Sequence, residues 1–289
     1  MDYTVSTIDK IDERFDFNNT TQYIKSIQVS LDGFSYIVTN PDDGTHLALR
    51  DYNFGTDLSL SRIEEITSDL FNNEDILSGH NQKINIAFTT RPWAMVPAML
   101  FNEGNITKIL DINFKPDEFT KTTYCKIPGS KIVLASRIPV KIAQILENHS
   151  SNLNFIPHQA AFIFNALQTL KHNVSDSALF MAVHGRFFDL AYIQNNEVIF
   201  YNNFAYTQYD DVLYFALSAM ERLEIRSDEA HIFIQGNDLV KEIIPQEIKK
   251  YIRHVYIDNQ LYNERYSYQF DQLPLYKYKL LTGIFRCGS

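Results

Sequence analysis

Two similar series of predicted strands and turns, one in each half of the chain, restrict the possible folds more than any other feature. Residues 27–31 alternate apolar and polar side chains like a half-buried strand, Asp32-Gly33 follows as a tight turn, and residues 34–38 return as a second strand. Residues 179–183, the turn His184-Gly185 and residues 187–193 repeat this order, and 152 positions separate the two turn glycines. The chain therefore contains two related halves.

Each half continues in the same way, with a third strand followed by helices that alternate with buried strands. Amphipathic helices are predicted over residues 60–71, with Ser59 or Ser61 as the cap, and near Asp210, and buried strands over 83–89 and 230–234. Three hairpin-linked strands followed by alternating helices and strands predict a mixed sheet covered by helices. We expect an α/β protein of two lobes, each built on a mixed five-stranded sheet.

The lobes are expected at residues 1–156 and 157–289. Residues 1–22 resemble a polar lead-in, and residues 157–170 are apolar nearly all round, which is typical of a buried helix at the lobe junction. Pro97–Phe101 is predicted as a short helix, and a strand pair is predicted on either side of Pro128-Gly129. The length of 289 residues suits two domains at roughly 150 residues each.

The charge and the cysteines exclude several classes of protein. The net charge is −9, with 26 Lys and Arg against 35 Asp and Glu and no dense basic run, so we expect no nucleic-acid partner. No stretch approaches the ~18 apolar residues of a membrane span, and the charged N-terminus is not a signal peptide, so we expect no membrane insertion. Cys125 and Cys287 form no spaced pattern, which favours a reducing compartment and a cytoplasmic location.

The repeated strand-strand-strand-helix-strand-helix unit, with a turn glycine after each first strand, resembles the actin-like ATPase (ribonuclease H-like) superfold. In detail it is similar to the branch that contains the cytoplasmic assembly proteins of type IV pili and type II secretion. It is most similar to an uncharacterised bacterial family of about this length that has this fold and no assigned activity. The most family-like residues are 26–40, 83–99 and 180–201.

This resemblance implies a nucleotide site, and the residues can be tested against it. Working members hold phosphates between two hairpins of pattern Asp-x-Gly followed by Ser or Thr, with aspartates that position hydrated Mg²⁺. Here the glycines would be Gly33 and Gly185, and apolar Leu31 and Val183 stand two positions before them. Asp32 and His184 occupy the middle positions, and an ordinary turn role is favoured for both.

The third motif of the superfold is a Gly-Gly pair that approaches adenosine. This chain has Gly236-Asn237 after a buried strand, and a helix start with Asn237 as N-cap is favoured over a base-binding loop. We therefore expect no catalytic residue and no bound cofactor. The cleft between the lobes has as its only candidates Asp32, Gly33, His184, Gly185, Gly236 and Asn237.

The remaining histidines and tyrosines give little support for a metal site or another catalytic function. No two of the eight histidines are four residues apart and none adjoins a cysteine, so no metal site is expected. Seven of the 17 tyrosines fall between residues 251 and 278, which fits either a protein interface or ordinary half-buried positions. The favoured function is a non-catalytic scaffold or adaptor with a protein partner. The alternatives are an ATP-binding or ATP-hydrolysing phosphotransferase with atypical ligands, and a module that binds a small ligand between the lobes.

Overall fold

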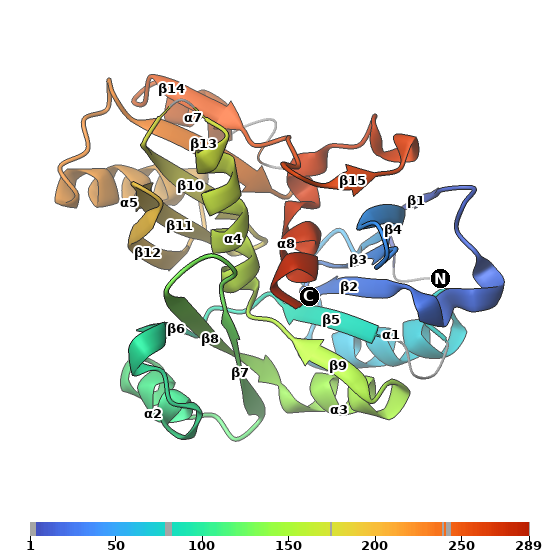
Figure 1. The fold of residues 1–289 in the computed structure, drawn as a ribbon. Helices are drawn as coiled ribbons and strands as arrows, with labels where there is room; N and C mark the ends of the chain where they lie inside the picture. The colour runs from blue at the N-terminus through green and yellow to red at the C-terminus, as the bar shows by residue number, and fades with distance from the viewer. Residues whose placement is uncertain (1–3, 79–82, 174, 239, 241–243, 289) are drawn as a thin grey trace. The chain divides into compact units, whose positions relative to one another are not determined.

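The computed structural model describes residues 4–78, 83–173, 175–238, 240 and 244–288 (Figure 1). The chain forms two compact units: Met1–Ala161 with Asn263–Leu273 and Leu280–Ser289, and Phe162–Tyr262 with Pro274–Lys279. These units differ from the expected lobes at 1–156 and 157–289, because two late segments pack with the first unit. In the segment 263–273 a strand pairs with the first sheet, and in the segment 280–289 a helix packs on that sheet; sequence periodicity does not reveal such contacts between distant residues.

The first unit contains a mixed seven-stranded sheet of order β1-β4-β3-β2-β5-β9, with β15 also paired to β4. The three strands linked by hairpins are antiparallel, whereas β5 and β9 join β2 in parallel. In Figure 1, β15 (red) lies beside β4 (blue), although the two strands are far apart in sequence. The strands are β1 (Ser6–Ile11), β2 (Ile24–Val29), β3 (Gly33–Thr39), β4 (Thr45–Asn53), β5 (Lys83–Phe88), β9 (Asn152–Phe155) and β15 (Arg265–Tyr266).

The prediction for residues 1–22 is wrong, because the segment contains β1 and the 3₁₀ helix η1 (Phe17–Gln22). Backbone pairing from Ser6 opposite Asn53 to Ile11 opposite Ala48 adds β1 to the edge of the sheet. The side chains of β1 are exposed or half-buried, so backbone hydrogen bonds rather than an apolar pattern hold it in place. The sheet accordingly has more than the five strands expected.

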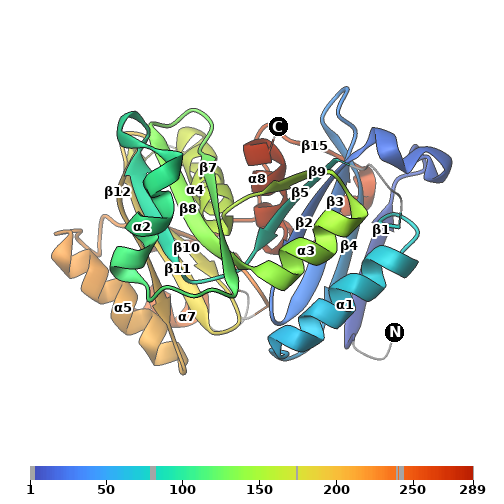
Figure 2. The ribbon, with the colours of Figure 1, turned by 90° about the horizontal axis from the view of Figure 1, so that it is seen from below.

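Helices cover both faces of this sheet (Figure 2). Helices α1 (Leu60–Asn73) and α3 (Val140–His149) pack on one face, where Ile63 and Leu146 join the side chains of β2 to β5 in one core. Of the two caps expected for α1, Ser59 and Ser61, the structure shows Ser59, whose side chain accepts a hydrogen bond from the Arg62 amide. Helix α8 (Lys279–Gly288) lies against the opposite face, where Gly288 contacts Asn85 of β5.

A separate three-stranded sheet of order β6-β8-β7 belongs to the same unit. It comprises β6 (Trp93–Pro97), β7 (Thr120–Lys126) and β8 (Ile132–Pro139), with the 3₁₀ helix η2 (Ala98–Leu100) and α2 (Glu103–Asn113) beside it. The predicted strand pair and short helix are present, but β6 and α2 were not predicted. Helix α2 buries only Ile106 and Leu110, which is too few residues for a clear helical pattern.

The second unit confirms the expected five-stranded mixed sheet, in the order β12-β11-β10-β13-β14. Its strands are β10 (Ser177–Val183), β11 (Phe187–Gln194), β12 (Glu197–Ala205), β13 (His231–Gly236) and β14 (His254–Ile257). Helices α5 (Tyr209–Arg222) and α7 (Ile244–Lys249) pack on one face. The predicted junction helix is α4 (His158–Lys171), and Phe162 from it contacts the Tyr201 ring of β12.

Two short 3₁₀ helices, η3 (Tyr268–Phe270) and η4 (Leu275–Lys277), precede α8.

Within the described part of the chain, no helix has both the length and the hydropathy that crossing a membrane requires.

Candidate functional site

The first hairpin turn joins β2 to β3 and contains Asp32 and Gly33. Val29 pairs with Phe34, and the Ser30 amide donates to the Gly33 carbonyl at 3.0 Å, so Leu31 and Asp32 are the two loop residues. The Ser30 hydroxyl donates to the Asp32 carboxylate, with 2.5 Å between the oxygens. The carbonyls of Leu31 and Asp32 accept from the amides of Leu58 and Phe54 at 2.8 and 2.9 Å. The turn and its carboxylate are therefore held by neighbouring groups.

The second hairpin turn joins β10 to β11 and contains His184 and Gly185. The His184 amide donates to the Phe187 carbonyl at 2.9 Å, so Gly185 and Arg186 are the two loop residues. Gly33 is the last residue of its turn, whereas Gly185 is the second residue of its own.

The two turn glycines are therefore not structurally equivalent. Backbone pairing matches Ser30 with His184, a shift of 154 positions, which corrects the shift of 152 inferred from the glycines. Glycine is tolerated at several positions of a hairpin turn, so its place in the sequence does not fix the register.

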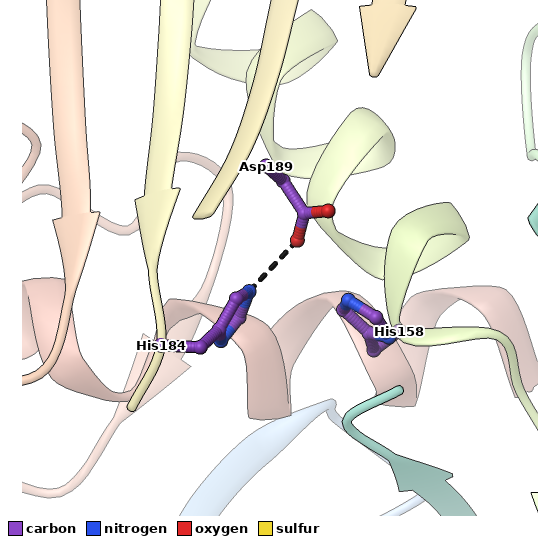
Figure 3. Close-up of side chains that lie close together, drawn as sticks. All are labelled: His158, His184 and Asp189. Carbon is purple, nitrogen blue, oxygen red and sulfur yellow. Dashed lines mark hydrogen bonds and ion pairs between the residues drawn. The ribbon is translucent and has the colours of Figure 1, made fainter. Parts of the chain in front are cut away.

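A hydrogen-bonded network surrounds the tip of the second hairpin, and Figure 3 shows its contact between His184 and Asp189. Nε2 of His184 lies 2.7 Å from Oδ2 of Asp189, and the Tyr201 hydroxyl donates to Oδ1 of the same carboxylate at 2.6 Å. The Tyr206 hydroxyl donates to the His184 carbonyl at 2.7 Å. Burial, reinforced by the Asp189 carboxylate, raises the pKa of Tyr201 well above its usual value.

A buried carboxylate that accepts from Nε2 fixes the orientation of the imidazole and leaves Nδ1 as its acceptor nitrogen when the ring is neutral. Such a pair can take part in general acid–base chemistry. Sequence reasoning selected His184 and missed Asp189 and Tyr201. The available signal was Asp189 itself, a carboxylate inside the apolar run 187–191 of a predicted strand.

The aspartates that the family resemblance implies are absent from both expected positions. Val183 lies in the core of the second unit, and Leu31 packs against the core of the first. The second turn, residues 184–187, contains no carboxylate, and the Asp189 carboxylate is already bonded to His184 and Tyr201. Hydrated Mg²⁺ is bound mainly through oxygen ligands, and the side chains of this turn supply none.

Gly236 and Asn237 lie beside the second hairpin. Gly236 has a φ of 125°, and a Cβ atom on it would lie 2.1 Å from the Val183 carbonyl oxygen, so the close approach of β10 requires glycine here. The Asn237 amide donates to that same carbonyl at 3.2 Å. The start of the helix expected after Asn237 falls on residues 239 and 241–243, which lie outside the described residues, so the N-cap role stays a prediction.

The structure thus brings the candidates together in two groups, one in each unit. Asp32 and Gly33 share the first turn, and His184, Gly185, Gly236 and Asn237 gather around the end of β10. The expectations that the protein binds no metal and no cofactor stay predictions.

The mixed sheets, the paired hairpins and the flanking helices define a protein with the actin-like ATPase fold. A solved structure from Bacteroides thetaiotaomicron, described as a protein with actin-like ATPase fold and unknown function, has a TM-score of 0.77 and 22% sequence identity, and the match covers 93% of this chain and 98% of that one. A chain of the PilM–PilN type IV pilus biogenesis complex has a TM-score of 0.65 and 6% identity, over 92% of this chain and 98% of that one.

The chain belongs to the family described as a protein of unknown function, DUF3822, whose profile matches residues 12–255. The comparison with curated proteins gave no significant match. The resemblance inferred from the sequence, to an uncharacterised family with an actin-like fold and more distantly to a pilus assembly protein, is confirmed.

Proposed function

We propose that this protein is a non-catalytic scaffold or adaptor that works in the cytoplasm through contacts with another protein. The observation that carries the proposal is the second hairpin turn, residues 184–187, which lacks any carboxylate. The nearby Asp189 side chain is directed into a buried network with His184 and Tyr201 instead. An actin-like architecture whose second hairpin turn lacks a metal-positioning carboxylate favours binding over phosphate chemistry.

Apolar side chains around α2 supply a surface for such contacts. The most exposed are Met99 at 90%, Ile112 at 79%, Phe119 at 71% and Leu100 at 70%. Exposed apolar side chains gathered in one small substructure are characteristic of protein interaction sites. The similar chain in the PilM–PilN complex was solved together with a protein partner, which supports the same kind of role here.

The first experiment is isothermal titration of the full chain with ATP and Mg²⁺. We expect no heat of binding for the wild type or for Asp32→Ala, because no side-chain carboxylate of the second turn helps to hold the metal. Binding tighter than roughly 100 µM, lost in Asp32→Ala, would contradict the proposal.

The second experiment is capture of partners from the native cell by the tagged protein. A partner recognised through the surface around α2 should be lost with Met99→Glu combined with Phe119→Glu. It should be retained with Ile199→Glu, a matched exposed apolar position of the second unit. Loss of the partner with both variants, or with neither, would show that the surface around α2 is not the interface with the partner.

The second candidate function is an ATP-using phosphotransferase with atypical ligands, related in fold to the sugar kinases. The contact that favours it is the His184–Asp189 pair, in which a buried carboxylate orients an imidazole at a hairpin tip. It requires ATP turnover that falls in His184→Gln and in Asp32→Ala. A turnover rate left unchanged by both substitutions would eliminate this candidate.

A further inference from the structure

Two cysteines that are 162 positions apart in sequence meet inside the first unit. Cys125 lies on β7, and Cys287 lies in the last turn of α8. The Cys125 sulfur lies 3.3 Å from the Lys126 carbonyl oxygen and 3.6 Å from the Cys287 carbonyl oxygen, two acceptors for its one thiol proton, and both cysteines are free. The two thiols are also hydrogen-bonded to each other, which lowers the pKa of Cys125 and raises that of Cys287.

Neighbouring contacts hold α8 in the position that brings these thiols together. Arg286, one residue before Cys287, donates from Nε and Nη2 to both carboxylate oxygens of Glu264, at 2.8 and 3.1 Å. The same carboxylate lies 3.2 Å from Nε2 of His46 on β4. On the other side of Cys287, a Cβ atom added to Gly288 would lie 2.2 Å from Cγ of Asn85, so the helix backbone rests directly on β5. The thiols therefore meet because the unit is packed in this way.

The two thiols differ in the way that sequential oxidation requires. Cys125 is buried, with 7% of its surface exposed, and the side-chain hydrogen bond with Cys287 lowers the pKa of its thiol although burial opposes that shift. Cys287 is partly exposed and keeps its proton. The Cys125 sulfur already lies 3.6 Å from the carbonyl oxygen of Cys287, so the two residues that would be joined are neighbours in the folded unit.

We propose that Cys125 and Cys287 form a peroxide-responsive thiol pair that closes a disulfide between β7 and α8. The Cys125 sulfur attacks one oxygen of hydrogen peroxide, the O–O bond breaks, and the hydroxide that leaves takes up a proton to become water. The Cys287 sulfur then attacks the sulfenic sulfur of Cys125, the S–O bond breaks, and a second water leaves with the Cys287 proton. Two thiols and one hydrogen peroxide yield one disulfide and two waters.

The test uses the full chain, reduced and then exposed to hydrogen peroxide, with Cys125→Ser and Cys287→Ser as companion variants. In the wild type, peptide mass spectrometry without reductant should find both thiols lost together in one intrachain disulfide, and a thiol reductant should restore them. In Cys287→Ser, Cys125 should accumulate as a sulfenic acid that dimedone traps. In Cys125→Ser, oxidation of Cys287 should be slower by more than about tenfold.

Three outcomes would overturn the proposal: a sulfinic or sulfonic acid at Cys125 of the wild type without the disulfide, disulfides between chains only, or equal oxidation rates in the two variants. The wild-type mass spectrum decides the main point even if a serine variant folds poorly. Thermal unfolding of the reduced variants provides the control for folding.

Discussion

Replacing Lys25 by methionine should stabilise the protein at neutral pH. The Lys25 side chain on β2 is fully buried, and its ammonium donates to the Thr20 carbonyl of η1. Among the described residues no carboxylate lies within ion-pair distance of it, and burial lowers the pKa of Lys25 to about 7. A lysine in the unfolded chain stays charged up to its ordinary pKa of 10.5, so folding at pH 7 must strip water from a charge or remove a proton.

The magnitude follows from the difference between the two pKa values. A folded-state pKa below the unfolded one means that the penalty is absent above pH 10.5, grows as pH falls, and is complete below pH 7. At about 1.4 kcal/mol per pKa unit, the penalty is about 4 kcal/mol at pH 7 and about 2 kcal/mol at pH 9. Methionine keeps the apolar stem, removes the charge and loses one hydrogen bond worth about 1 kcal/mol. The expected gain is therefore about 3 kcal/mol at pH 7 and about 1 kcal/mol at pH 9.

The assay is denaturant unfolding of the wild type, Lys25→Met and Lys108→Met at both pH values. Lys108 is an exposed lysine of α2, and its replacement should leave the free energy of unfolding nearly unchanged. The reasoning is refuted if Lys25→Met is less stable than the wild type at pH 7. It is also refuted if the difference between the two proteins is the same at pH 7 and pH 9.

Two further experiments test how the second unit is held together. Gly236→Ala should lower the free energy of unfolding by more than about 3 kcal/mol, because the new Cβ atom would overlap the Val183 carbonyl. The control is Gly44→Ala, at a glycine with a φ of 71° and open space around it, which should lower the free energy of unfolding by about 1 kcal/mol in the same assay. Lys279 and Asp258 form a buried ion pair at 2.5 Å. Lys279→Ala should lower the free energy of unfolding by about 3–5 kcal/mol, because it leaves a buried carboxylate with the Thr169 hydroxyl but without its cation. Combining Lys279→Met with Asp258→Leu should recover most of that loss in a double-mutant cycle.

Local patterns in the sequence predicted the elements whose side chains bury one clear face. Helix α1 has both a cap at Ser59 and a regular apolar stripe, and its apolar positions from Leu60 to Phe71 were predicted. Strand β1 and helix α2 were not predicted, because backbone hydrogen bonds hold β1 in the sheet and α2 buries only two side chains. Such elements exist through contacts with residues distant in sequence, which periodicity does not record.

The sequence predicted the two hairpin turns of the candidate site but not the hydrogen bonds between its side chains. The turns at Asp32-Gly33 and His184-Gly185 were recognised, yet the contact between His184 and Asp189 depends on which residues form the two-residue loop. Moving that loop by one residue would place Asp189 opposite a different neighbour on β10. Glycine alone does not decide between these registers, so the network with Tyr201 becomes visible only in the structure.

The composition of the first unit sets the order in which the chain can fold during synthesis. Residues 1–161 form most of that unit, but Leu280–Ser289, which contains nearly all of α8, must join them after the whole of the second unit has been made. At ribosomal rates of roughly 5–20 residues per second, the face of the sheet that α8 covers stays open for on the order of ten seconds. Most strands of the second unit can pair with one another within this interval. The nascent first unit therefore presents an uncovered sheet face to chaperones, and to other nascent chains, until α8 arrives.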